Sequence, residues 1–232
     1  MATRAAPTRF QGFADTDGRF FRALAKHQDR NWFAAHKHEY EQGWVEPMRL
    51  LLAEVREQID PLFAHHPLGD PKVFRIYRDV RFSKDKSPFK TTIGAYVPLS
   101  GVGHGPGAPV PVYVQLGTET FVGAGHYMMD PGQLTRFRAA VLDDAQGKAL
   151  VRIVAALEKA GFSLESFATL KKVPRGFDPE HPRADLLRRK SLAVGFPTLP
   201  KRLLVSRALI GWLVKQTEKA RPLVEWLADV TA

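Results

Sequence analysis

The sequence of 232 residues contains no cysteine. This absence excludes disulfide bonds, thiolate nucleophiles and zinc sites with cysteine ligands, and it is typical of a reducing compartment. No apolar run approaches the roughly 18 residues that a membrane-spanning helix needs. The N-terminal residues MATRAAPTRFQGF lack the apolar core of a signal peptide. We therefore expect a cytoplasmic protein that does not contact a membrane.

Acidic residues are few relative to basic ones, and the imbalance is local. The chain carries 34 Lys and Arg against 24 Asp and Glu, a formal net charge of +10. Residues 72–90 hold seven basic and two acidic residues and residues 171–207 hold ten and three, so these segments carry +5 and +7 and the rest of the chain −2. Two basic segments that converge in space favour an anionic partner. If they do not converge, they are solvated faces, and the sequence leaves both interpretations open.

Hydrophobic periodicity predicts one α+β domain over residues 1–232, with residues 1–14 as a candidate disordered tail. The expected order is N-terminal helices, a central antiparallel β-meander of about four strands, and C-terminal helices with short strands. The expected helices cover residues 18–28, 30–42, 46–59, 131–142, 147–160, 183–190, 203–217 and 221–229. The expected strands cover residues 74–82, 93–97, 110–116, 120–123, 170–173 and 192–196, with a loop rich in glycine and proline at 101–109. Predicted N-caps are Asp17, Asp29 and Asp130, the last in a capping box with Gln133.

The densest charge lies in residues 74–90, FRIYRDVRFSKDKSPFK. Alternate side chains of a strand point to opposite faces. The pattern therefore predicts a core face (Phe74, Ile76, Arg78, Val80 and Phe82) and a polar face (Arg75, Tyr77, Asp79 and Arg81). Because burying an unpaired guanidinium is costly, Arg78 requires a core carboxylate beside it or an opening to solvent.

Three hypotheses follow from this segment. The first is a basic cleft that holds a phosphate- or carboxylate-bearing small molecule through charge-assisted hydrogen bonds, with these anion-binding residues: Arg75, Arg78, Arg81, Lys84, Lys86 and Lys90. The second is association with nucleic acid by charge and without base reading, since no recognised nucleic-acid-binding motif is present. The third is a structural or interaction domain whose hairpin is held by cross-strand ion pairs. If the cleft is catalytic, the candidate residues are Tyr77, Asp79 and His126, the last as a general base.

Other motifs suggest further residues that could line such a site. Gly123-Ala-Gly125 before a capped helix fits a phosphate cradle, or alternatively glycines needed for close packing or a bulge. Trp32 and His36 recur at helical spacing, which is typical either of core packing or of a site lining. The full set of candidate lining residues is Trp32, His36, Lys37, Gly123, Gly125 and Arg175. The histidine spacing predicts no metal site, no nucleophile elbow is present, and no cofactor is indicated.

The segment FRIYRDVRFSKDKSPFKTTIGAY, residues 74–96, resembles the signature of a family of bacterial and fungal proteins classed as domain of unknown function 2461. The resemblance extends along nearly the whole chain, through Arg30–Phe33 with His36 to Tyr40, Gly123–Arg138, and Pro174–Lys190. Ala124 departs from the family's glycine-rich segment, because the resemblance implies another glycine at this position. The resemblance implies that these segments belong to one architecture, and it implies no activity, cofactor or catalytic residue.

Overall fold

The computed structural model describes residues 8–100, 107–165 and 167–232. Within these residues the strands form one six-stranded sheet with the order β1-β2-β3-β4-β6-β5, in which every neighbouring pair is antiparallel. The strands are β1 (Lys72–Val73), β2 (Thr92–Val97), β3 (Val110–Gly117), β4 (Phe121–His126), β5 (Ser163–Glu165) and β6 (Leu192–Gly195). The predicted α+β class and the predicted meander, here β1 to β4, are confirmed.

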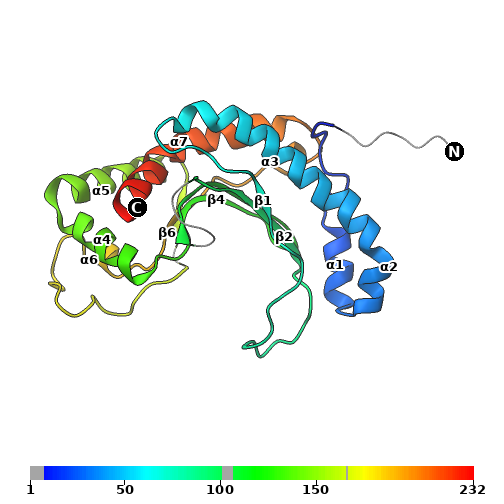
Figure 1. Cartoon of the computed structure of the whole chain (residues 1–232), viewed down its shortest axis with the longest axis horizontal. Coiled ribbons are helices and arrows are strands. Elements are labelled where there is room, and N and C mark those ends of the chain that lie inside the picture. The colour runs from blue at the N-terminus through cyan, green and yellow to red at the C-terminus, as the bar shows by residue number, and fades with distance from the viewer. Residues whose placement is uncertain (1–7, 101–106, 166) are drawn as a thin grey trace.

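Seven α-helices of the described chain cover one side and both ends of the sheet. They are α1 (Arg19–Lys26), α2 (Arg30–Tyr40), α3 (Glu46–Ile59), α4 (Pro131–Leu142), α5 (Asp144–Lys159), α6 (Ala184–Leu187) and α7 (Ala208–Thr231). The sheet is curved, and α3 and α7 lie across its convex side (Figure 1). Helices α1 and α2 stand at one end of the arch and α4 to α6 at the other, so the concave side is left open. No helix of the described residues is long and apolar enough to cross a membrane.

Strand alternation explains why only the convex side is covered. In β3, Val112, Val114 and Leu116 are almost fully buried, whereas Tyr113 and Gln115 between them are only partly buried. The buried set faces α7, which packs against both β3 and β4 and contributes fully buried leucines such as Leu213 and Leu223. The main core therefore lies between the convex face and the helices.

The helix starts mostly follow the capping signals in the sequence. Asp29 caps α2 by accepting hydrogen bonds from the N–H groups of Asn31 and Trp32, and Asp130 with Gln133 forms the expected capping box of α4. Asp17 does not cap α1. Gly18 occupies the N-cap position with φ 64°, and the Asp15 carboxylate accepts from the N–H groups of Arg19 and Phe20 at 3.0 and 2.9 Å. A glycine adopts this left-handed conformation at little cost. Helix α1 therefore begins at Arg19, one residue later than a cap at Asp17 predicts.

Several expected elements are arranged differently. Residues 203–217 and 221–229 belong largely to one continuous helix, α7, because Ala220, Leu223 and Val224 are buried on both sides of Pro222. No strand forms at 170–173, and the edge strand is β5 instead. Part of the expected tail at 1–14 is packed, since Phe10 and Phe13 are buried in the core. Residues 1–7 and 101–106, and with the latter most of the expected loop at 101–109, lie outside the described residues.

The expected strand at 74–82 is the main correction. Pairing with β2 ends at Phe74, whose N–H donates to the carbonyl of Gly94 at 2.8 Å, and the chain then leaves the sheet as a projecting hairpin (Figure 1). We call residues 74–90 the basic hairpin. Ile76 and Phe89 are buried, but Phe82 is 95% exposed. The segment therefore has no continuous core face, and its alternation does not correspond to a sheet.

Candidate ligand site on the concave face of the sheet

Aromatic side chains gather on the uncovered, concave face of the sheet. Tyr96 of β2 lies opposite Tyr113 of β3, and Gln115 lies opposite Phe121 of β4, so these side chains share one face. A cavity of about 550 Å³ opens over this face, and Phe74, Tyr127 and Phe167 complete its aromatic lining. We call the six rings the aromatic strip: Phe74, Tyr96, Tyr113, Phe121, Tyr127 and Phe167.

The rings of the aromatic strip form a continuous chain of contacts. From the hairpin end, the ring centroids of Phe74 and Tyr113 are 6.4 Å apart, and those of Tyr113 and Phe121 are 6.1 Å apart. Tyr96 joins at 5.3 Å from Phe74. At the other end Phe167 lies 5.8 Å from Phe121 and 5.1 Å from Tyr127. These separations are typical of favourable ring pairs, so the strip is an ordered surface.

Three members of the aromatic strip remain open to solvent. Phe74 is 45% exposed, Phe167 43% and Tyr127 56%. Isolated exposed apolar residues are ordinary in soluble proteins, but a contiguous exposed patch usually marks a binding surface. Three exposed rings around one cavity are such a patch.

Glycines keep the concave face hollow. A Cβ added at Gly94 would lie 2.8 Å from the Tyr113 hydroxyl, and one added at Gly123 would lie 2.8 Å from the Phe121 ring. Gly125 has φ 119°, and a Cβ there would lie 2.5 Å from the carbonyl of Leu192. Gly123 and Gly125 line the cavity, but they lie inside the paired strand β4, with a register shift opposite them in β3. They therefore serve close packing and a bulge, as one of the two interpretations of this motif predicts.

Tyr113 and Gln115 are hydrogen-bonded to each other among the rings, and the carboxylate of Glu119 also lines the cavity. The Tyr113 hydroxyl donates to Oε1 of Gln115 at 2.9 Å. Burial, with a contribution from Tyr127, raises the pKa of Tyr113 to about 12, so this hydroxyl stays protonated at neutral pH. Because the oxygen of Gln115 is occupied, its amide nitrogen is the group that remains to donate to a ligand.

Basic side chains border the cavity at its hairpin end. Lys90 Nζ lies 5.3 Å from the centre of the Phe74 ring and donates to the carbonyl of Arg75 at 3.1 Å. Burial, and then the charge of Arg75, lowers the pKa of Lys90. Lys72 lies opposite Tyr96 in the sheet register and so shares the concave face. Lys72 and Lys90 thus place two positive charges beside the rings, and Arg75 lies near enough to Lys90 to contribute to its lowered pKa. None of the three is among the described residues that line the cavity.

The remaining basic residues of the hairpin contact the hairpin itself. Arg78 pairs with Asp85, whose pKa is lowered by hydrogen bonds from Ser87 and by this ion pair. Arg78 therefore does not intrude into a core face, and its partner is a turn carboxylate. Arg81 binds Asp79 at 2.7 Å, and Lys86 donates to the carbonyl of Val80 at 2.9 Å. These contacts, with exposed Lys84 between them, are those expected of a hairpin held by ion pairs.

The three candidate catalytic residues lie outside the cavity. Tyr77 is on the hairpin, with its ring against Phe33 and Phe89, and exposed Asp79 pairs with Arg81. His126 follows Gly125 in β4 and by strand alternation points to the opposite, covered face. It is fully buried, and burial lowers its pKa to about 4, so the imidazole is neutral at pH 7. The catalytic assignment of these residues stays a prediction.

The candidate lining residues of α2 form a separate cluster. The Trp32 ring stacks between those of His27, at 5.4 Å, and His36, at 3.9 Å, while Lys37 is exposed. None of these α2 residues is among the described residues that line the 550 Å³ cavity. Arg175 is exposed on the loop between β5 and α6.

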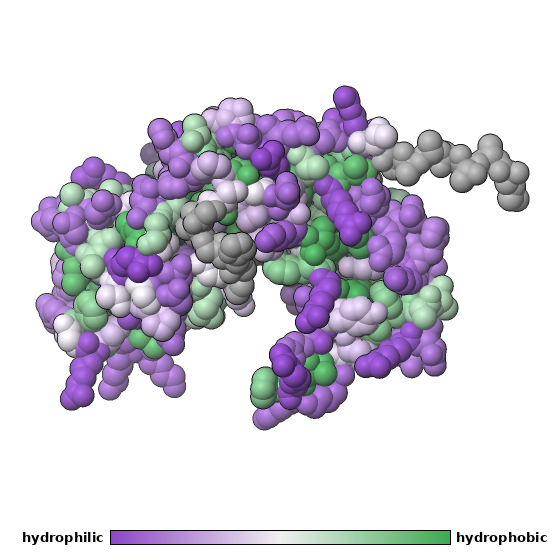
Figure 2. Space-filling model, viewed as in Figure 1, coloured by the Kyte–Doolittle hydropathy of each residue, from purple (hydrophilic) through white to green (hydrophobic). Residues whose placement is uncertain are grey.

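The two basic segments stand on opposite sides of the concave face. The basic hairpin projects at one end, and the loop between β5 and α6 projects at the other (Figure 1). We call residues 167–183 the basic loop; it carries exposed Lys171, Lys172 and Arg175 as well as Phe167 of the aromatic strip. The space-filling view shows the molecule hollowed between these two ends (Figure 2). The basic hairpin and the basic loop therefore do not merge into one patch; they flank the same surface. The predicted segment 171–207 extends beyond the basic loop to Arg207, which pairs with Glu54 of α3.

The comparison with protein families agrees with this architecture. A family model described as a conserved hypothetical protein, DUF2461, matches residues 18–226. The chain belongs to the DUF2461 family. The matched range includes the whole aromatic strip, the basic hairpin and the basic loop. No curated protein matches the chain.

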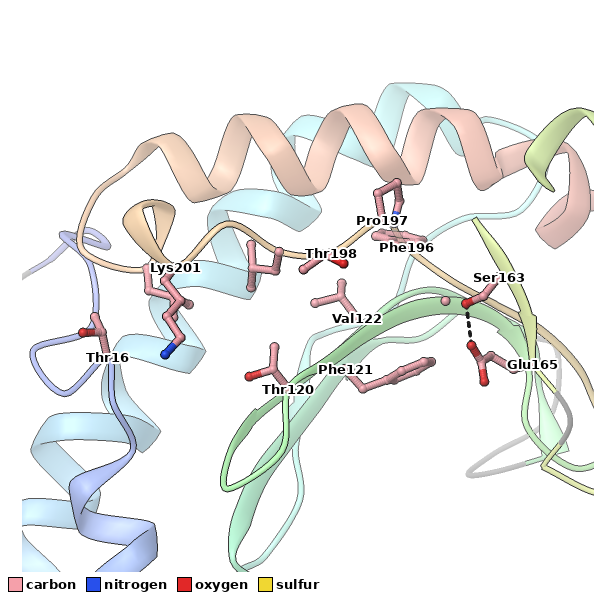
Figure 3. Close-up of a pocket in the computed structure, with 13 residues that line it drawn as sticks. Thr16, Thr120, Phe121, Val122, Ser163, Glu165, Phe196, Pro197, Thr198 and Lys201 are labelled. Carbon is pink, nitrogen blue, oxygen red and sulfur yellow. Dashed lines mark hydrogen bonds between the residues drawn. The ribbon is translucent and has the colours of Figure 1, made fainter. Parts of the chain in front are cut away.

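This DUF2461 chain also has a second, more polar cavity. It measures about 370 Å³ and lies where β4 and β6 meet residues 196–204 (Figure 3). Ser163 Oγ donates to Oε1 of Glu165 at 2.6 Å on one side, and Lys201 lies toward Thr16 on the other. Phe121 lines both cavities, so the polar cavity adjoins the aromatic strip at this ring.

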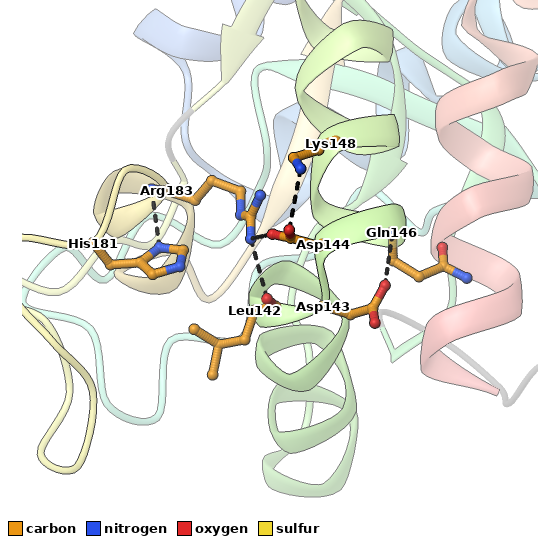
Figure 4. A network of polar contacts seen from close by, with 7 residues as sticks. All are labelled: Leu142, Asp143, Asp144, Gln146, Lys148, His181 and Arg183. Atoms are coloured by element: carbon orange, nitrogen blue, oxygen red, sulfur yellow. Dashed lines mark hydrogen bonds and ion pairs between the residues drawn. The ribbon is translucent and has the colours of Figure 1, made fainter.

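A polar network fixes the far end of the basic loop. Arg183 donates to the carbonyl of Leu142 at 3.1 Å and lies 3.4 Å from Asp144, which also pairs with Lys148 at 3.1 Å (Figure 4). The backbone N–H of Arg183 donates to Nδ1 of His181 at 3.0 Å. Arg183 is therefore engaged in holding the loop against α5, while the lysines earlier in the loop face solvent.

The sequence interpretation missed the rings of the aromatic strip other than Phe74. The signal was present in the alternation itself. In Val112-Tyr113-Val114-Gln115-Leu116, the valines and the leucine identify one buried face, and the residues between them identify the other. Aromatic residues at intervening positions of three strands indicate that the second face also has a function.

Proposed function

We propose that this protein binds a small anionic ligand that carries a planar ring, such as an aromatic phosphate or carboxylate, on the concave face of its sheet. One observation carries the proposal: six connected aromatic rings line one cavity, and three of them, Phe74, Tyr127 and Phe167, are exposed. The proposal keeps the anionic partner expected from the sequence and moves its site from the hairpin to the sheet.

The ring of the ligand would stack on the aromatic strip. Cavities of roughly 300–1,000 Å³ accommodate small molecules, and this one measures about 550 Å³. Phe74 and Phe167 offer exposed ring faces at its two ends. The Tyr113 hydroxyl and the amide of Gln115 supply the few polar groups that fix orientation in a mainly apolar site.

The anionic group would bind at the hairpin end. Lys90 is held above the Phe74 ring, so its ammonium is fixed next to the place where a ring would stack. Arg75 and Lys72 add a guanidinium and a second ammonium, which are the groups that bind phosphate and carboxylate most strongly. Arg78 and Arg81 already have carboxylate partners, so we assign them to the hairpin fold. The proposal assigns no reaction.

Calorimetric titration with adenosine 5′-monophosphate tests the proposal, with adenosine and inorganic phosphate as partial ligands. We expect the nucleotide to bind with one site per chain and more tightly than either part. Phe167→Ala should weaken nucleotide binding about tenfold, because stacking on one aromatic ring contributes roughly 1–3 kcal/mol. Lys90→Gln should weaken nucleotide binding and leave adenosine binding unchanged.

Phe82→Ala is the matched control, because Phe82 is also an exposed phenylalanine but lies at the hairpin tip. It should not change the affinity. Absence of nucleotide binding, or equal weakening by Phe82→Ala and Phe167→Ala, would contradict the site.

A further inference from the structure

We infer that the physiological ligand of the aromatic strip is a single-stranded nucleic acid rather than a free nucleotide. The inference rests on the proposed function, because it concerns the same rings and the same cations. It adds that the ligand is a polymer whose successive bases stack along the strip.

The first argument is the length of the aromatic strip. Its rings extend from Phe74, directly after β1, across β2, β3 and β4 to Tyr127 and Phe167. Neighbouring ring centroids are 5.1–6.4 Å apart, so one base covers only part of the strip. Proteins that bind single strands use several aromatic side chains in a row, on which successive unstacked bases rest.

The second argument is that the chain segments at both ends of the strip carry exposed basic residues. Lys72, Arg75 and Lys90 border the end at Phe74. Lys171 and Lys172 are exposed on the basic loop that carries Phe167, at the opposite side of the concave face (Figure 1). A free nucleotide needs cations at one end only, whereas a strand that runs between the two segments places phosphates near both.

The third argument concerns the strandedness of the ligand. The bases of a duplex are stacked on one another, so their faces are not available to protein rings. The basic residues alone could bind the phosphates of a duplex. In that case exposed rings such as Phe74 and Tyr127 would make no contact with the bases. Glu119 also lines the cavity, and its carboxylate disfavours a phosphate there while it accepts hydrogen bonds from base amino groups. Rings and charges together fit a single strand whose bases face the sheet.

Fluorescence anisotropy with labelled deoxyadenosine 10-mer tests the inference, with a 10-base-pair duplex and adenosine 5′-monophosphate as competitors. We expect the single strand to bind at least 100-fold more tightly than the mononucleotide and at least tenfold more tightly than the duplex. Each phosphate contact with a single strand contributes a salt slope of about −0.7. Five contacts, one for each of the basic residues named above, therefore predict a loss of affinity of roughly 100-fold between 50 and 200 mM salt.

Variants at the two ends separate a polymer from a monomer. Replacing Lys171 and Lys172 together by glutamine should reduce the salt slope for the 10-mer and leave mononucleotide binding unchanged. Phe167→Ala and Tyr127→Ala should each weaken both ligands, and Phe82→Ala neither. Because these side chains are exposed, the variants should fold.

The outcomes distinguish the two proposals. If the 10-mer binds no more tightly than the mononucleotide, or the duplex binds as tightly as the single strand, the inference is wrong while the proposed small-molecule site stands. If neither ligand binds, both are wrong.

Discussion

Tyr113 and Val114 are neighbours in the chain and lie on opposite sides of the sheet. Val114 is buried beneath the helices, and the Tyr113 ring faces the open cavity. The same alternation decides the role of His126, because it directs the imidazole away from the cavity that Gly125 and Tyr127 line. At this scale a residue's type is less informative than the face of the strand on which it lies.

The buried imidazole of His126 predicts a pH dependence of stability. Its pKa is lowered to about 4 by burial, against 6.5 for an exposed histidine. Below pH 6.5 the unfolded chain takes up the proton and the folded chain does not, so stability is lost as the pH falls from 6.5 toward 4. Because each pKa unit corresponds to about 1.4 kcal/mol, this lowered pKa predicts a loss of roughly 2 kcal/mol between pH 7 and pH 4.5. Urea unfolding at pH 7 and pH 4.5 measures it.

Two histidine variants give this measurement its control. His126→Gln removes the titration and should show a smaller loss of stability between the two pH values than the parent chain. His38→Gln changes an exposed histidine of α2 and should behave as the parent. An unchanged loss in His126→Gln would show that other groups cause the acid sensitivity.

The basic hairpin shows why alternation at the level of an element is not sufficient. Residues 74–82 alternate as a strand does, but beyond Phe74 no strand of the described residues pairs with them, and their backbone hydrogen bonds across the hairpin go to residues 88–90. Tyr77 and Phe89 form an isolated β-bridge. Asp85 and Asp79 form ion pairs with Arg78 and Arg81. The strands 93–97 and 110–116 were predictable because each has a buried face and a partner. The open aromatic face was not, because it depends on which side the helices cover.

Helix α4 offers a prediction at the scale of one element. Its N-cap Asp130 accepts from the Gln133 N–H at 2.8 Å, and Gln133 in turn donates to the carbonyl of Gly107 at 2.6 Å. Asp130→Ala should lower the free energy of unfolding by about 1 kcal/mol, the typical contribution of an N-cap. Asp130→Asn should retain most of this stability, since asparagine also caps helices well.

Urea unfolding of both Asp130 variants at pH 7 measures the contribution of the cap. Equal losses of stability would mean that the carboxylate acts through its charge and not as a cap.

At the scale of the whole molecule, the distribution of charge matters more than its sum. The net charge of +10 comes from residues 72–90 and 171–207. The fold places the basic hairpin and the basic loop on either side of the aromatic face, whereas Arg207 pairs with Glu54 of α3 and Lys201 lies at the polar cavity. The sequence predicts both segments and the anionic character of the partner. It does not predict that the sheet is curved between them, because this curvature depends on how α3 and α7 pack over the convex side.

The most direct test of the aromatic strip is a spectrum of the rings themselves. We would record two-dimensional ¹H–¹³C spectra of protein with labelled phenylalanine and tyrosine during titration with adenosine 5′-monophosphate. The account predicts saturable shifts at Phe74, Tyr113, Tyr127 and Phe167, and none at Tyr77 or Phe82. Shifts confined to the hairpin rings Tyr77 and Phe82, or no shifts at all, would contradict it.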